Sequence, residues 1–193
     1  MRLPEIDRGD TLRHRFLIGM ISRVSGMRLP DAARVAFYDK DFAGPALGEW
    51  TQHTMRGPSG WTVSERELMA AAVAGWNQCP FCVGAHGAIA VHGIDRTTID
   101  AVLSDHRTAP ISTRLRAALT FIEKLTRDPS GVTPQDAQAA YDAGVSATDL
   151  LDASAVAALF NIITRYANAL DFQIPSDDDL VTSANMLLRR GYS

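Results

Sequence analysis

Apolar residues recur every three or four positions along most of this chain, which is the spacing of one face of an α-helix. Between Ser112 and Arg127, for example, they stand at Leu115, Leu119 and Ile122. No segment keeps up the alternation of apolar and polar residues that a half-buried strand needs, and no Asn-Gly hairpin turn is present. Alanine, the strongest helix former, occurs 28 times in 193 residues. The sequence therefore predicts an all-α fold.

Capping and helix-breaking residues divide the chain into a helical bundle of about eight helices. Ser64 and Glu67 fit the S-x-x-E capping box, which predicts that a helix begins there and continues to about Trp76. Residues 1–10 and 51–62 lack a helical pattern, so we expect a loose arm and a loop. Nine segments underlie this approximate count, and they span residues 11–25, 30–38, 64–76, 79–92, 95–104, 112–127, 133–144, 146–170 and 176–190.

Charge and hydropathy exclude several classes of protein. The 19 basic and 22 acidic residues give a net charge of −3, which argues against a nucleic-acid partner. No apolar run approaches the roughly 18 residues of a membrane helix, and the first residues lack the apolar core of a signal peptide. We therefore expect no membrane partner and a cytoplasmic location. Structural disulfides are rare in that compartment, so the two cysteines need another explanation.

Those two cysteines form the motif Cys79-Pro80-Phe81-Cys82, a C-x-x-C. Pro80 is favourable in the first turn of a helix, so both thiols are expected at a helix N-terminus. Free backbone N–H groups and the helix dipole stabilise thiolates at that position. A disulfide can form between residues at this spacing after modest rearrangement, so the motif favours redox chemistry.

A histidine and a glutamate accompany the cysteines. His86 lies four residues after Cys82, one helical turn away on the same face, where it can accept the thiol proton directly or through a water. Glu67 lies on the preceding helix and reaches the same pocket if the two helices pack antiparallel. There it would orient His86 and raise the basicity of the imidazole, giving a carboxylate–imidazole–thiol relay.

Each of these residues also has a purely structural interpretation. Cys79 and Cys82 could be two small buried residues, or two ligands of a zinc ion with His86, although no fourth ligand is evident. His86 alone could be a hydrogen-bonded core residue, and Glu67 could serve only as the capping-box carboxylate of Ser64. The combination favours the redox interpretation, and we expect neither a metal nor a cofactor.

The stretch from Glu65 to Ile94 resembles the AhpD-like, carboxymuconolactone decarboxylase superfamily, through its pattern E-x11-C-x-x-C-x-x-x-H. A weaker likeness continues through residues 144–170. The resemblance implies an AhpD-like all-α fold, homo-oligomeric assembly and alkylhydroperoxidase activity. It also implies that Cys82 is the peroxidatic thiol, Cys79 the resolving thiol, and His86 with Glu67 the proton relay. One departure is Phe81, where redox members carry a second histidine.

We accordingly expect a thiol-dependent hydroperoxide reductase that takes a small-molecule hydroperoxide and is reduced by an external dithiol or a thioredoxin-like partner. An acid–base enzyme of the decarboxylase type and a non-enzymatic redox sensor or scaffold remain alternatives. A single domain is expected over residues 1–193, with an N-terminal extension (1–60), a redox core (61–110) and closing helices (111–193). The helix over 146–170 is apolar on more than one face, which predicts a homo-oligomer, dimer or trimer.

Polar residues outside the motif are assigned structural roles. His106 lies in a loop-like segment and is expected to be solvated. Asn161, Arg165 and Asn168 lie along one face of an apolar helix, where a buried network or an oligomer interface is expected. The three aspartates at 177–179 suit the start of a helix and not a metal site.

Overall fold

A computed structural model describes residues 1–192 of the chain, and within them every regular element is helical. The all-α prediction is confirmed, with eleven α-helices in place of the expected eight or so, and one short 3-10 helix at Pro129–Gly131. The α-helices are α1 (Pro4–Arg8), α2 (Leu12–Ser25), α3 (Asp31–Tyr38), α4 (Pro45–Arg56), α5 (Val63–Trp76), α6 (Pro80–Ala90), α7 (Arg96–Asp105), α8 (Thr113–Arg127), α9 (Pro134–Asp142), α10 (Ala147–Leu170) and α11 (Asp177–Arg190).

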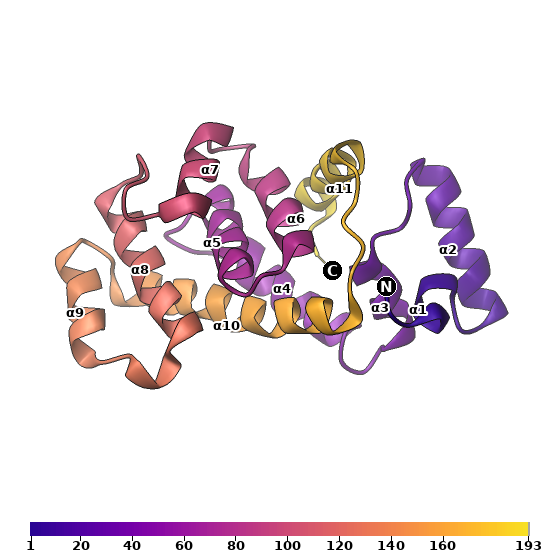
Figure 1. Cartoon of the computed structure of the whole chain (residues 1–193), viewed down its shortest axis with the longest axis horizontal. Coiled ribbons are helices and arrows are strands. Elements are labelled where there is room, and N and C mark those ends of the chain that lie inside the picture. Colours follow the sequence, from indigo (N-terminus) through magenta and orange to yellow (C-terminus); the bar gives the residue numbers. More distant parts are fainter. Residues whose placement is uncertain (193) are drawn as a thin grey trace.

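Helix α5 forms the centre of the fold. It packs against α4, α6, α7, α8 and α10, and it is buried on every side (Figure 1). Met69, Ala70, Ala71, Val73 and Ala74 are completely inaccessible to solvent. A run of small alanine side chains lets neighbouring helices approach closely from several directions, which explains why α5 is apolar all round after Glu67.

Helix α10 is the longest element and crosses the bundle beside α5 and α8 (Figure 1). It is also the one helix of residues 1–192 that is long and apolar enough to cross a membrane. Val156, Leu159 and Phe160 are fully buried against the rest of the protein. Burial of this kind is what the core helix of a folded domain requires.

The turn between α5 and α6 is tied to α10 by amide side chains. Asn77 donates from Nδ2 to Asn161 Oδ1 and to Thr164 Oγ1, at 3.0 Å each. Asn168 Nδ2 donates to the carbonyl of Asn77 at 2.9 Å. Gln78, the next residue, has a left-handed backbone (φ 55°) that allows the tight connection. Asn161 and Asn168 thus take part in a partly buried network that fixes the chain just before Cys79, whereas Arg165, expected in the same network, is exposed and bonds only to Asn161.

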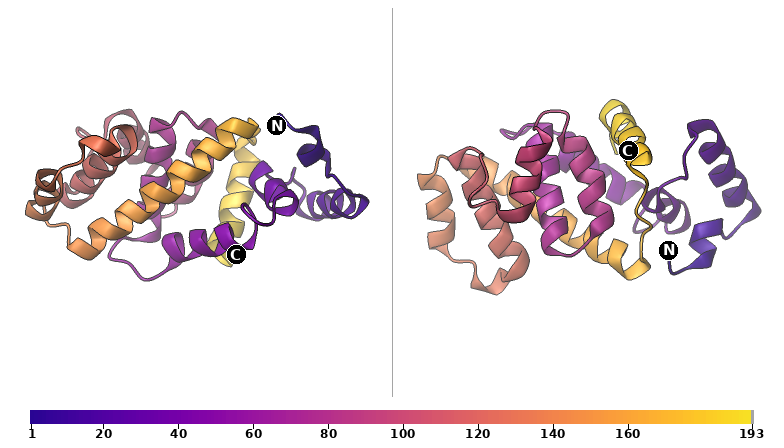
Figure 2. Two further views of the ribbon diagram at one scale, coloured as in Figure 1. Left: turned by 90° about the horizontal axis from the view of Figure 1, so that it is seen from below. Right: turned by 45° about the horizontal axis from the view of Figure 1, so that its top comes forward.

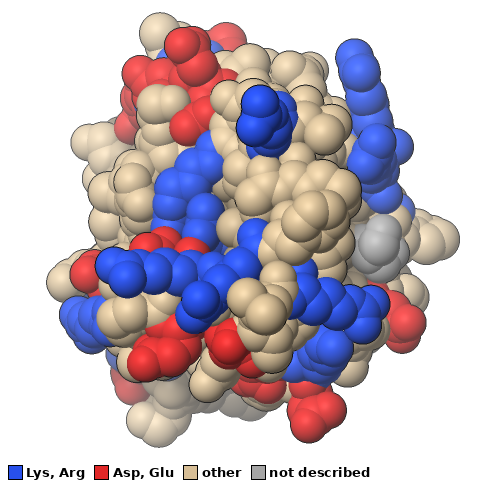
Figure 3. Space-filling model, turned by 90° about the vertical axis from the view of Figure 1, so that its right-hand side faces the viewer, with Lys and Arg blue, Asp and Glu red and all other residues tan. Residues whose placement is uncertain are grey.

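The helices α1, α2 and α3 lie together at one end of the molecule, beyond α11, as both views of Figure 2 show. Figure 3 shows Lys and Arg side chains gathered across this end. Helix α2 also exposes apolar side chains there, with Leu12, Phe16 and Val24 each more than two-thirds accessible. Helix α11 packs on α6 and so lies between this end and the centre of the fold.

Two segments that we expected to be irregular are helical. Residues 1–10 include α1, because Ile6 is buried and Arg28 pairs with Asp7 at 2.7 Å. Residues 51–56 of the expected loop belong to α4, which Pro45 opens at its first position. Burial of Thr51, Thr54 and Met55 on one face stabilises α4, which is a tertiary effect that the local pattern does not reveal.

Two further predictions were wrong in detail. The capping box of α5 is formed by Thr62 and Glu65, not by Ser64 and Glu67: Thr62 Oγ1 accepts from the Glu65 N–H at 3.2 Å, and Glu65 Oε2 accepts from the Thr62 N–H at 2.8 Å. His106 is buried instead of solvated and hydrogen-bonds Thr120. Desolvation holds the pKa of His106 below its usual value. The aspartates at 177–179 do begin a helix, as expected.

Candidate active site

The two cysteines meet at the N-terminus of α6. Cys79 is the residue that caps this helix and Cys82 lies in its first turn, after Pro80 at the first helical position. Both side chains are buried, both thiols are free, and their sulfur atoms lie 2.8 Å apart. The expected placement of both thiols at a helix start is therefore found, and the pair is close enough to share a proton.

The two thiols differ in acidity. Hydrogen bonding with the Cys82 thiol lowers the pKa of Cys79, and the backbone N–H of Cys82 acts in the same direction. Hydrogen bonding with Cys79 and burial raise the pKa of Cys82. The first negative charge of the reduced pair is therefore favoured on Cys79, which lies nearest to the free N–H groups of the helix.

His86 and Glu67 form the pair that the spacing predicted. Helices α5 and α6 pack against each other and bring His86 Nδ1 to 2.6 Å from Glu67 Oε2. Glu67 is completely buried, and the His86 ring packs edge-on against Phe160 with ring centres 4.4 Å apart. With Nδ1 bound to the carboxylate, Nε2 is the ring nitrogen left to exchange a proton with a ligand.

Arg56 and Tyr192 complete the environment of Glu67, and sequence reasoning missed both. Arg56 Nη1 donates to Glu67 Oε1 at 2.6 Å, and the Tyr192 hydroxyl donates to the same oxygen at 2.8 Å. Burial raises the pKa of Glu67, but the hydrogen bonds and charges of His86 and Arg56 outweigh it and hold that pKa below its usual range. Glu67 is thus a buried carboxylate that stays ionised.

Cys82 and His86 line the same cavity, of about 160 Å³. Its walls come from α3, α4, α6 and α10, together with Phe172 and Tyr192. Within the described residues no hydrogen bond joins His86 to either sulfur, so a proton would pass between them through a water or a bound ligand. Cys79 lines a different cavity, of about 880 Å³, between α6 and the start of α11.

Several known proteins share this fold and part of this sequence. Residues 44–124 match the family model of the carboxymuconolactone decarboxylase family. An uncharacterized peroxidase-related protein with an AhpD core from Ralstonia eutropha JMP134 is similar in structure, with 26% identity, a TM-score of 0.77 and coverage of 95% of this chain and 96% of that one. The chain has an AhpD-like fold. No curated protein matches this AhpD-like chain significantly.

Two more distant structures share the AhpD-like fold. A peroxidase-related protein from Silicibacter sp. TM1040 has 24% identity and a TM-score of 0.75, with 92% of each chain covered. The debrominase Bmp8, in complex with 2,3,4-tribromopyrrole, has 17% identity and a TM-score of 0.69, with 94% of this chain and 92% of that one covered. At these identities the likeness is one of fold, and the fold therefore occurs with more than one named activity.

Phe81, where the resemblance leads one to expect a histidine, is part of the cavity wall in this AhpD-like protein. Its ring packs edge-on against Phe172, with centres 5.2 Å apart, and borders the cavity beside Cys82. The position therefore supplies apolar surface and no titratable group.

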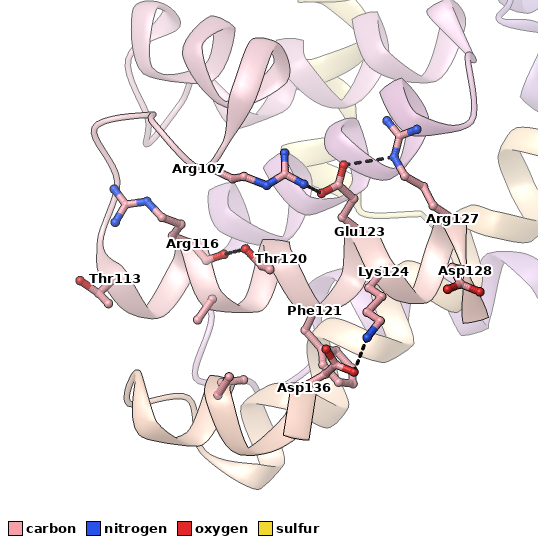
Figure 4. A pocket seen from close by; sticks show the side chains of 13 residues that line it. Arg107, Thr113, Arg116, Thr120, Phe121, Glu123, Lys124, Arg127, Asp128 and Asp136 are labelled. Atoms are coloured by element: carbon pink, nitrogen blue, oxygen red, sulfur yellow. Dashed lines mark hydrogen bonds and ion pairs between the residues drawn. The ribbon is translucent and has the colours of Figure 1, made fainter. Parts of the chain in front are cut away.

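A further cavity lies far from the thiols, between α8 and α9, and Figure 4 shows its lining. Its charged side chains are mostly paired with each other: Glu123 with Arg107 and Arg127, and Lys124 with Asp136. Neither cysteine, His86 nor Glu67 lines it. These ion pairs are a sufficient explanation for the charges, so this cavity is not part of the candidate site.

Proposed function

We propose that this AhpD-like protein is a thiol-dependent hydroperoxide reductase that uses Cys79 and Cys82 in a disulfide cycle. The observation that carries the proposal is the pair of free thiols with sulfur atoms 2.8 Å apart, one of which shares a cavity with the His86–Glu67 pair. Such a pair can be oxidised by two electrons with little movement of the backbone.

The first step is activation of Cys82 and attack on the peroxide. The Cys82 proton passes through the cavity to His86 Nε2. The Cys82 sulfur then attacks one peroxide oxygen and the O–O bond breaks, leaving Cys82 as a sulfenic acid. The departing alkoxide takes a proton from protonated His86 and leaves as an alcohol. Glu67 stabilises the positive charge that His86 carries between these two transfers.

The second step forms the disulfide. The Cys79 thiolate attacks the Cys82 sulfur, an S–S bond replaces the S–O bond, and the hydroxide takes from solvent the proton that Cys79 released on ionising and leaves as water. The balance for one turnover is one hydroperoxide and two thiols converted to one alcohol, one water and one disulfide. An external dithiol or a thioredoxin-like protein then supplies two electrons by thiol–disulfide exchange.

The cavity at Cys82 favours an uncharged organic hydroperoxide. Among the residues that line it none is Lys, Arg, Asp or Glu, and most are aromatic or aliphatic. A charged substrate would lose its hydration there without a partner, whereas an alkyl or aryl group would bury apolar surface. Reductant would reach Cys79 from its own, larger cavity on the other side.

We also propose that the protein acts as a homo-oligomer.

Steady-state consumption of an organic hydroperoxide in the presence of a dithiol tests the proposed function. We expect turnover that requires both cysteines and a loss of two titratable thiols per chain after mild peroxide treatment. If the two thiols are oxidised once and no further hydroperoxide is consumed, the result would contradict an enzymatic role and indicate a redox sensor. Retention of both thiols would contradict any redox role of the pair.

A further inference from the structure

The segment that follows α11 leads back into the site. Gly191 has a left-handed backbone (φ 76°), which a residue with a side chain adopts at a cost. The next residue, Tyr192, donates its backbone N–H to Gln52 Oε1 on α4 at 2.8 Å. This bend directs the Tyr192 ring inward, where it lies under the Arg56 guanidinium, 4.8 Å from the ring centre, and beside the His86 ring.

The Tyr192 hydroxyl sits between the two members of the relay. It donates to Glu67 Oε1 at 2.8 Å and lies 3.5 Å from His86 Nδ1. Arg56 binds the same carboxylate oxygen, so Oε1 has two donors and Oε2 is left to His86. A carboxylate held at one oxygen by two fixed donors cannot rotate freely, and its second oxygen keeps one direction.

We propose that Tyr192 is a positioning residue that sets the tautomer of His86 by fixing the Glu67 carboxylate. With Oε2 held against Nδ1, the proton of the neutral imidazole stays on Nδ1, and Nε2 remains the proton acceptor. The assignment of the His86 tautomer rests on the contacts alone, whereas the consequence of that tautomer for turnover rests on the proposed function. Tyr192 also borders the Cys82 cavity, so the segment after α11 completes one wall of the site.

Tyr166 provides a matched control, because it borders the same cavity but its hydroxyl donates to Asp39 Oδ2 at 2.9 Å and not to the relay. We would compare Tyr192→Phe and Tyr166→Phe with the wild type by the nitrogen-15 chemical shifts of the His86 ring. In the wild type and in Tyr166→Phe, the shifts should report Nδ1–H as the dominant neutral tautomer. In Tyr192→Phe they should move towards a mixture.

Turnover gives an independent second readout. Loss of one hydrogen bond to the buried carboxylate should lower kcat about tenfold in Tyr192→Phe and leave KM for the hydroperoxide unchanged, with an altered pH profile. An unchanged His86 tautomer in a folded Tyr192→Phe protein would overturn the proposal. If the wild type itself shows no peroxidase activity, the proposed function fails, but the chemical shifts still decide the role of Tyr192.

A second variant keeps the test decisive if Tyr192→Phe does not fold. Replacing Tyr192 alone by 3-fluorotyrosine preserves the ring and the hydroxyl but makes the hydroxyl a stronger donor. The hydroxyl should then hold Glu67 more firmly, so the Nδ1–H population should stay dominant while the pH profile of turnover shifts. An unchanged pH profile would count against a positioning role.

Discussion

Cys79 and Cys82 touch through their sulfur atoms at 2.8 Å, yet they border two cavities that share no residue. Cys82 faces the apolar cavity that contains His86, and Cys79 faces the larger cavity beside α11. Once a disulfide joins the two sulfurs, a reductant in the cavity at Cys79 can therefore reverse an oxidation that took place at Cys82 in the other cavity. The lower pKa of Cys79 also makes it the first of the two thiols to ionise, so that it can attack Cys82 once Cys82 has been oxidised.

The first prediction concerns the division of labour between the thiols. Cys82→Ser should abolish turnover, because it removes the sulfur that faces the substrate cavity. Cys79→Ser should leave Cys82 as a persistent sulfenic acid, since no resolving thiol remains. The protein is treated with peroxide and a dimedone-type probe, and mass spectrometry then measures the adduct of the probe with the sulfenic acid. An adduct on Cys79 in the Cys82→Ser protein, formed at the wild-type rate, would reverse the assignment.

The second prediction concerns His86. In His86→Ala the alkylation of Cys82 at neutral pH should slow, because the cavity loses its only imidazole and the Cys82 proton has one acceptor fewer. The matched control is His92→Ala, which removes an exposed imidazole beyond the end of α6. Alkylation followed over a range of pH measures the effect. Identical profiles for His86→Ala and the wild type would show that Cys79 and the helix terminus alone activate Cys82.

The third prediction follows from the depressed pKa of Glu67. A carboxyl group whose pKa is lower in the folded than in the unfolded protein stabilises the fold above its unfolded pKa, and this contribution is lost as the pH falls through the folded value. Glu67→Gln leaves the partly buried Arg56 without its counter-charge, so the free energy of unfolding should fall by about 3 kcal/mol near neutral pH. The difference from the wild type should narrow as the pH drops below about 5.

Urea unfolding at stepped pH measures this difference. Glu49→Gln is the control, because Glu49 is exposed on α4 and its replacement should change stability by less than about 0.5 kcal/mol. If the difference in the free energy of unfolding between Glu67→Gln and the wild type stays constant from neutral to acid pH, Glu67 is not held ionised by its partners.

The fourth prediction separates two overlapping capping motifs. Thr62→Ala should lower the free energy of unfolding by about 1 kcal/mol, because the Thr62 hydroxyl accepts from the Glu65 N–H at the start of α5. Ser64→Ala should change it by less than about 0.5 kcal/mol, since Ser64 does not cap the helix. Thermal or urea unfolding of the two variants compares them directly, and equal losses would contradict the observed cap.

The same pair of motifs shows what the sequence could and could not predict. Thr62 with Glu65 and Ser64 with Glu67 both fit the pattern of a capping box, and only burial decides between them. Glu67 turns inward to Arg56 and His86, so it cannot serve a cap. Helix starts with one acceptable cap, such as Ser146 before α10, were predicted correctly because the decisive contacts are local.

The residues of the candidate site also differ in whether local sequence could predict them. Cys79, Cys82, His86 and Glu67 come from two consecutive helices, so spacing alone brings them near one another. Tyr192 reaches Glu67 from 125 residues away, and no local pattern marks it. Arg56 was also difficult to predict, because its contact depends on α4, and the buried face of that helix at Thr51, Thr54 and Met55 has few strongly apolar residues.

The last prediction concerns assembly through α10. Leu151 and Ile162 lie eleven residues apart, close to three helical turns, so both project from one side of the helix. They remain 68% and 37% accessible in the single chain, although the opposite side of α10 is buried. A second copy that covers this stripe would remove apolar surface from water, and closed symmetry would make the contact reciprocal. Light scattering at micromolar concentration should therefore give a dimer or trimer mass, and Leu151→Glu should shift it towards one chain, whereas Gln135→Glu on the exposed side of α9 should not. A wild-type mass near 20.9 kDa, that of a single chain, would contradict the prediction.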